Sequence, residues 1–89
     1  MKAVVTVVGK DQVGIIAAVC VHLASFNVNV LDISQTVMQG YFTMMMVVDL
    51  SACTTSFDQL SERLGAFGEG RGLAIRIQRE DIFDAMHKI

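Results

Sequence analysis

The polar side chains with the best spacing for binding chemistry lie in one stretch of seven residues, Gly9-Lys10-Asp11-Gln12-Val13-Gly14-Ile15. A β-branched run, residues 3–8, precedes it, and an apolar run, residues 15–26, follows it, which predicts a tight strand-to-helix turn. Such a turn directs backbone N–H groups and a helix N-terminus at whatever lies above the strand end. Asp11 is expected to cap the helix, and Gly14 to let its first turn approach a ligand or another backbone. The pattern therefore predicts one binding corner.

Other residues capable of chemistry are few and scattered: Cys20, His22, Cys53 and His87. Cys20 and His22 are two positions apart in a predicted helix, so they point to different faces and do not form a metal site. His22 on an apolar helix is interpreted as an interface or surface histidine, and His87 lies in a terminal segment that is a poor platform for catalysis. The sequence thus predicts no catalytic residue, no metal site, no cofactor and no enzymatic activity.

Composition limits the classes of partner. The chain has 89 residues, which predicts a single domain, and 53% of them are hydrophobic while 18% are charged. Association with a second copy would bury this apolar excess. A net charge of −2 without a basic patch argues against direct nucleic-acid binding. The apolar run 13–21 is too short to span a bilayer, and Lys2 leads directly into a strand without a signal peptide, so a cytoplasmic location is expected.

The order of predicted elements is β-α-β-β-α-β. It consists of strands at 2–8, 30–38, 41–50 and 73–78, a helix ending near Ser25, a second helix capped by Thr55, and a short C-terminal helix over 80–89. Right-handed crossovers place both helices on one face of a four-stranded antiparallel sheet. This is the α+β, ferredoxin-like plait, with a core over 1–79 and the C-terminal helix added to it.

The central hairpin has a predicted register. A two-residue turn at Gln39-Gly40 pairs Val37 with Phe42, Gln35 with Met44, Ile33 with Met46 and Leu31 with Val48. One face of the hairpin is then apolar and covered: Leu31, Ile33, Val37, Phe42, Met44, Met46, Val48 and Leu50. The other face carries apolar residues too, namely Val28, Val30, Met45 and Val47, which leaves both side-by-side and face-to-face dimers open.

The first helix and the C-terminal segment also carry apolar faces. Ile16, Val19, Cys20 and Leu23 form a stripe at helical spacing that is expected to meet the core, while Ile15, Ala18 and His22 form a second face that is expected to meet a partner. Residues Ile82, Phe83, Met86 and Ile89 would lie on one side of the C-terminal helix, where they could cover the open sheet face or a partner protein.

Four segments of the sequence resemble the ACT domain, and in particular a short stand-alone ACT protein of bacteria and archaea. They are Val7–Ile15, Asn29–Gln35, Tyr41–Met44 and Ile82–Met86. The last two are similar to the stand-alone subgroup, which in part resembles the glycine cleavage system transcriptional repressor. The resemblance covers essentially the whole chain and implies a regulatory module with a ferredoxin-like fold.

The resemblance also implies a site and an assembly. ACT domains often bind amino acids between two copies placed side by side through strand 2 and helix 1, with the ligand between the first loop of one copy and the start of strand 2 of the other. The residues so implied are Gly9, Lys10, Asp11, Gln12, Val13, Gly14, Ile15 and Asn29. Asp11 would attract an α-amino group and repel an α-carboxylate unless N–H groups compensate. The expected function is an amino-acid-binding regulatory homodimer; the alternative is a protein interaction module without a small ligand.

Overall fold

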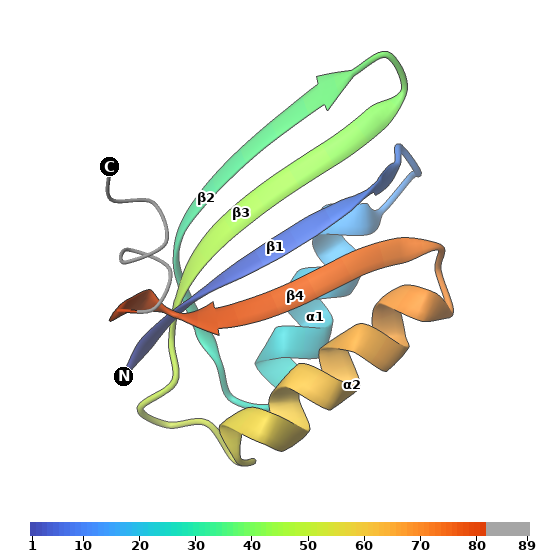
Figure 1. Cartoon of the computed structure of the whole chain (residues 1–89). Helices are drawn as coiled ribbons and strands as arrows, with labels where there is room; N and C mark the ends of the chain where they lie inside the picture. The colour runs from blue at the N-terminus through green and yellow to red at the C-terminus, as the bar shows by residue number, and fades with distance from the viewer. Residues whose placement is uncertain (82–89) are drawn as a thin grey trace.

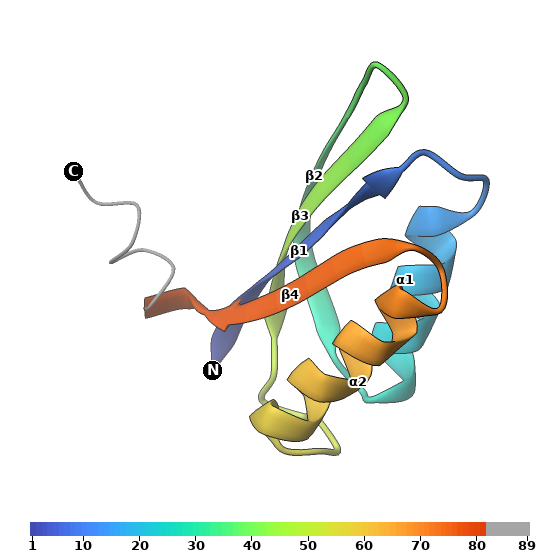
Figure 2. The same ribbon diagram turned by 45° about the vertical axis from the view of Figure 1, so that its right-hand side comes forward.

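The computed structural model of the chain describes residues 1–81. Its elements follow the predicted order: β1 (Lys2–Lys10), α1 (Ile15–Ser25), β2 (Asn29–Met38), β3 (Tyr41–Asp49), α2 (Phe57–Glu69) and β4 (Leu73–Arg79). The four strands form one antiparallel sheet in the order β2-β3-β1-β4, and both helices cover the same face of it (Figures 1 and 2). The ferredoxin-like prediction is confirmed. The predicted C-terminal helix lies outside the described residues from position 82 onward.

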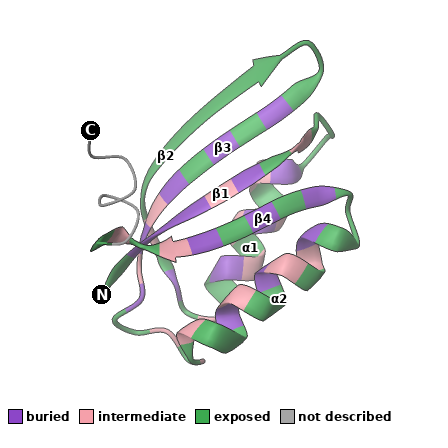
Figure 3. Ribbon diagram, in the orientation of Figure 1, coloured by how far each residue is buried: buried purple, intermediate pink, exposed green. Residues whose placement is uncertain are grey.

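The core lies between the helices and the covered face of the sheet (Figure 3). Alternate residues of the two central strands point into it because side chains of a strand alternate between its faces. Helix α2 approaches β4 closely, since a Cβ atom at Gly68 would lie only 2.6 Å from the carbonyl oxygen of Leu73. The largest fully buried side chains are Leu23, Met44, Met46, Leu60, Leu64, Val5, Val7, Val19 and Val48.

Strand β2 is less covered than the sequence predicts. The predicted covered residues of β3 and of the residue after it are buried: Phe42, Met44, Met46, Val48 and Leu50. Their predicted neighbours on β2 are exposed instead, with 46% of Leu31, 41% of Ile33 and 54% of Val37 accessible. β2 is the edge strand, and the helices cover the middle of the sheet rather than this edge (Figure 3). The prediction of a covered face was therefore wrong for β2, which presents an apolar edge to solvent.

The hairpin register is as predicted at its turn and differs at its far end. Val37 pairs with Phe42, and the pairings of Gln35 with Met44 and Ile33 with Met46 also hold. A register shift at Leu31 then pairs Val30, not Leu31, with Val48. Such bulges are common on edge strands, where one extra residue increases the local twist.

Further differences concern single residues of the predicted elements. β1 continues to Lys10 rather than ending at residue 8, so the loop after it is shorter than predicted. The cap of α2 is Ser56, whose hydroxyl accepts from the backbone N–H of Gln59 at 3.3 Å, and not Thr55. Ile15 was predicted to face a partner, and Val28 to lie on the open face of the sheet. Both residues belong to the core instead.

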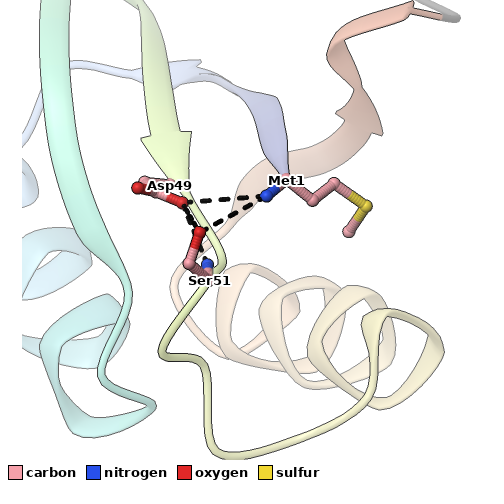
Figure 4. Close-up of polar contacts among 3 residues, drawn as sticks. All are labelled: Met1, Asp49 and Ser51. Carbon is pink, nitrogen blue, oxygen red and sulfur yellow. Dashed lines mark hydrogen bonds and ion pairs between the residues drawn. The ribbon is translucent and has the colours of Figure 1, made fainter.

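The start of β1 is held against the end of β3 (Figure 4). The hydroxyl of Ser51 donates to Oδ1 of Asp49 at 2.6 Å, and the backbone N–H of Ser51 donates to the same oxygen at 2.9 Å. The amino group of Met1 lies 3.9 Å from this carboxylate. These bonds from Ser51, followed by the nearby positive charges, lower the pKa of Asp49 from its ordinary value of 3.8.

Candidate functional site

The candidate site is the loop between β1 and α1. β1 stays paired on both sides through Gly9, which lies between Phe42 of β3 and Leu73 of β4. A Cβ atom at Gly9 would lie 2.6 Å from Cδ2 of Leu73 and 3.1 Å from the carbonyl oxygen of Gly72, so a larger residue there requires the side chain of Leu73 to move. After Lys10, the backbone N–H of Asp11 donates to the carbonyl of Gly40 at 2.8 Å. This bond fixes the start of the loop against the tip of the β2–β3 hairpin.

The end of the loop has a conformation that requires glycine. Gly14 has φ +81° and is the N-cap residue of α1, and its carbonyl accepts from the N–H of Ala18 at 2.9 Å. No side chain among residues 1–81 caps this helix, so the prediction that Asp11 caps it was wrong. The reason is geometric: the loop places Asp11 three residues before the actual cap. Among residues 1–81, the N–H groups of the first turn of α1 therefore receive no side-chain acceptor.

Open space surrounds a Cβ atom built at Gly14. The glycine is thus needed for its left-handed backbone and not for a close approach to another part of this chain.

Gln12 ties the loop to a distant part of the chain. Its side-chain amide donates to the carbonyl of Arg71, in the turn between α2 and β4, at 2.8 Å. The guanidinium of Arg71 lies over the ring of Phe67, 4.9 Å from its centroid, and Phe67 stacks on His22 of α1 at 4.2 Å. A chain of contacts therefore runs from the loop to the packing of α1 on α2.

A groove of about 440 Å³ opens beside the loop. Four of the predicted site residues line it: Asp11, Gln12, Gly14 and Ile15. Three residues that the sequence analysis did not predict for the site also line it: Ile16, Ala17 and Phe42. Ile16 and Ala17 belong to the first turn of α1. For Phe42 the available signal was the hairpin register, which places this residue on the covered face near the start of β3. The groove is thus lined by two polar residues of the loop, Asp11 and Gln12, and by apolar residues at the N-terminus of α1 and on β3.

The other predicted residues lie outside this groove. Gly9 packs within the sheet, Lys10 is an exposed residue opposite Tyr41, and the side chain of Val13 is fully exposed. Asn29 pairs with Asp49 at the start of β2. That pair lies at the end of the sheet opposite the loop, about 27 Å away along β3 at the usual rise of a strand. One chain alone does not bring Asn29 to the loop.

His22 lies between α1 and α2. Its ring meets Phe26 edge to face at 5.1 Å as well as stacking on Phe67, and among the described residues its Nε2 atom is buried without a hydrogen-bond partner. Burial lowers the pKa of His22 from its ordinary 6.5; the backbone of Arg63 opposes this change, and the charge of its guanidinium adds to it. The imidazole is thus neutral at neutral pH and serves the packing of the helices.

Within residues 1–81 there is no group of three or more His, Cys, Asp or Glu residues placed to hold a metal ion. Cys20 and Cys53 are both free and half-buried. Among the described helices, each is too short or too polar to cross a membrane.

Sequence comparison identifies the family of this fold and loop. The model of the ACT domain family matches residues 2–78. The chain belongs to the ACT domain family. A UPF0237 protein of Listeria monocytogenes is 54% identical to it over 89 residues, which cover 100% of both chains. A UPF0237 protein of Clostridium acetobutylicum is 52% identical over the same length, also with 100% of both chains covered.

Solved structures agree with this assignment. An ACT domain protein from Streptococcus pneumoniae superposes with a TM-score of 0.83 and 47% identity, covering 98% of each chain. A formyltetrahydrofolate deformylase from Pseudomonas syringae matches 88% of this chain with 27% of its own, at a TM-score of 0.79 and 25% identity. A protein described as a glycine cleavage system transcriptional repressor shares the fold, with a TM-score of 0.74 and 22% identity over 88% of this chain and 44% of its own.

Proposed function

We propose that this ACT domain is a regulatory module that binds a free amino acid in the groove beside the β1–α1 loop, and that it does so as a homodimer. The observation that carries the proposal is that Asp11, an acidic residue, and the N-terminal residues of α1, which has no side-chain cap, line the same groove. Free N–H groups of the first turn of α1 attract an α-carboxylate, and the carboxylate of Asp11 attracts an α-ammonium group. A zwitterion complements both. The proposal assigns no catalytic residue.

The edge strand β2 supports the proposed homodimer. In the part of the chain that the structure describes, β2 pairs with a strand on one side only, which leaves the backbone groups of its outer side unpaired. Ile33 and Val37 expose apolar side chains on the same strand. An exposed apolar edge of this kind is a template for pairing with another strand. Pairing with β2 of a second copy would satisfy these groups and bury the apolar side chains.

Such a pairing would also complete the site. In an antiparallel, two-fold symmetric pair of full-length β2 strands, the partner's Asn29 comes to lie beside Met38. Met38 is two residues before Gly40, whose carbonyl accepts from Asp11. The partner's Asn29 is thereby brought to the loop that Asn29 of the same chain does not reach. Ligand held between the two copies would stabilise the dimer over other arrangements, and this preference is the regulatory signal.

Thermal unfolding with a panel of amino acids tests the ligand. At 100 times its dissociation constant, a ligand adds about 2.7 kcal/mol to the stability of the folded state. The Asp11→Asn variant should lose this response while its own stability changes by less than about 0.5 kcal/mol, because Asp11 caps no helix. Glu62→Gln neutralises an exposed carboxylate of α2, outside the groove and away from β2; it is the matched control and should respond like the wild type. A wild-type chain that responds to no amino acid would refute ligand binding.

Sedimentation tests the dimer. Val37→Glu should dissociate it, because the change places a charge on the apolar side of β2. Thr36→Glu lies next to it on the opposite face of the same strand and should leave the dimer intact. A wild-type chain that is monomeric at all concentrations would overturn this part of the proposal.

A second candidate is a protein interaction module without a small ligand. The observation that favours it is the exposed apolar surface of α1 and the loop before it, where Val13 is fully exposed and Val21 is 70% exposed. A dimer without any amino-acid response would support this candidate over the first. Under either function we propose a cytoplasmic protein, since the two free cysteines suit a reducing compartment.

A further inference from the structure

We infer that the segment after Asp81, residues 82–89, lies across the open face of the sheet and closes an apolar groove there. The open face is the one turned away from α1 and α2 (Figure 2). Among residues 1–81 both helices lie on the other face, so the described helices leave this groove uncovered. The inference does not depend on amino-acid binding.

The groove has a volume of about 260 Å³ and crosses the sheet from edge to edge. Val4 of β1 pairs with Val47 of β3, and Val47 pairs with Asp32 of β2, so these residues form one row across the strands. Met45 lies in the next row of the same face and is 38% exposed, while Val4 is 6% exposed. Asp32 lines one side of the groove, and Glu80, which follows β4, lines the other. The floor between them is apolar.

The chain itself leads into this groove. β4 ends at Arg79, and the backbone turns helical at Glu80 and Asp81. Since Glu80 lines the groove, the residues that follow start at its edge. Three strand spacings separate β4 from β2, which is about 14 Å. Residues 80–89 in a helix would extend about 15 Å, which is enough to cross β1 and β3 and to reach β2.

The segment has the apolar side that such a groove requires. In a helix, its apolar residues lie on one side: Ile82, Phe83, Met86 and Ile89. Contact with Val4, Met45 and Val47 would remove both apolar surfaces from water at once. A segment of the same chain, joined to the groove at Glu80, has a higher effective concentration there than a free partner protein. The occupant that these observations favour is therefore the chain's own segment.

A covered open face also restricts the dimer. A second copy could not stack its sheet on a face that residues 82–89 already occupy. The face-to-face arrangement that the sequence left open is thereby excluded, and the exposed edge of β2 stays available for pairing.

Tryptophan fluorescence of the full chain tests the inference, because the chain has no tryptophan of its own. Phe83→Trp places a reporter on the apolar side of the segment, and Lys88→Trp places one off that side. The first should emit at a shorter wavelength than the second, and both should emit at the same wavelength in urea. Met86→Trp is a second reporter on the apolar side, to be used if Phe83→Trp does not fold. Equal emission from two folded variants would overturn the inference.

Variants of the sheet locate the contact. Met45→Glu places a charge in the groove and should shift the emission of the Phe83→Trp chain to longer wavelength. Ala74→Glu places the same charge on an exposed residue of the same face, beside Val8 and outside the groove, and should leave the emission unchanged. An unchanged emission in a folded Met45→Glu chain, or an equal shift in Ala74→Glu, would contradict the assignment to this groove.

The Val37→Glu change, expected to dissociate the proposed dimer, separates the chain's own segment from that of a second copy. The short-wavelength emission of Phe83→Trp should persist in the monomer. Its loss together with the dimer would show that the segment comes from the partner, and the inference would fail while the dimer stands. The same emission from a chain that is monomeric at all concentrations would support the inference although the proposed dimer fails.

Discussion

The side chain of Gln12 donates a 2.8 Å hydrogen bond to the backbone carbonyl of Arg71, 59 residues further along the chain. It joins the loop after β1 to the turn before β4. Because Arg71 also lies over Phe67, which stacks on His22, the loop and the helix layer share one set of contacts.

Gln12→Ala should destabilise the fold by about 1 kcal/mol, since the carbonyl of Arg71 loses its partner, although the exposed position lets water replace part of the bond. For a domain of this size the melting temperature should fall by about 4–8 °C. Val13→Ala, at an exposed neighbouring position, should change it by less than half as much. Equal melting temperatures for wild type and Gln12→Ala would show that the bond contributes nothing in solution.

Two glycines in open surroundings should respond to alanine with opposite signs. Gly14→Ala should destabilise the fold by about 1–2 kcal/mol, because φ +81° strains any residue with a Cβ atom. Gly65→Ala should stabilise it by about 0.8–1.0 kcal/mol, because Gly65 lies inside α2 with space for a methyl group. Urea midpoints measure both. A shift of the same sign in the two variants would contradict the backbone conformation at one of them.

Acidification below pH 6.5 should weaken the fold through His22. The folded pKa of His22 is lowered, so the unfolded chain binds the proton more readily, and stability is complete above the unfolded pKa of 6.5 and declines as the pH falls below it. His22→Phe keeps an aromatic ring between Phe26 and Phe67 but does not titrate. Urea midpoints at pH 7.5 and 5.0 should therefore differ more for the wild type than for this variant. The same difference in both proteins would show that other groups cause the decline.

A second acid transition should begin lower, near pH 4, through Asp49. Its folded pKa is also lowered, so for this acid the stabilisation is present above its unfolded pKa of 3.8 and is lost as the pH falls through the folded value. Ser51→Ala removes the hydroxyl that contributes most to the shift and should move the midpoint of acid unfolding to higher pH (Figure 4). Ser34→Ala, on the exposed strand β2, is the control. Circular dichroism during acid titration would show whether the two midpoints separate.

The sequence by itself determined the order of the elements and most of the core. Alternation over Leu73–Arg79 and helical spacing of Leu60 and Leu64 are local patterns, and a two-residue turn at Gln39-Gly40 fixes the register near it. The stretch Gly9–Ile15 was recognisable as the loop of interest for the same reason, since its glycines and polar residues interrupt two apolar runs.

Only the tertiary structure decided which residues of that loop share a groove and which apolar residues remain exposed. The loop is fixed by Gly40 and Arg71, which are distant in sequence, so no local pattern shows that Asp11 is not the cap. The hairpin register places Phe42 near the strand end, but only the fold places it beside Asp11 in the groove. The exposure of Ile33 follows likewise from the place of β2 at the sheet edge. The periodic spacing of apolar residues indicates that one face of an element is suited to burial. Whether that face is covered depends on how far the helix layer extends, and this is a property of the whole fold.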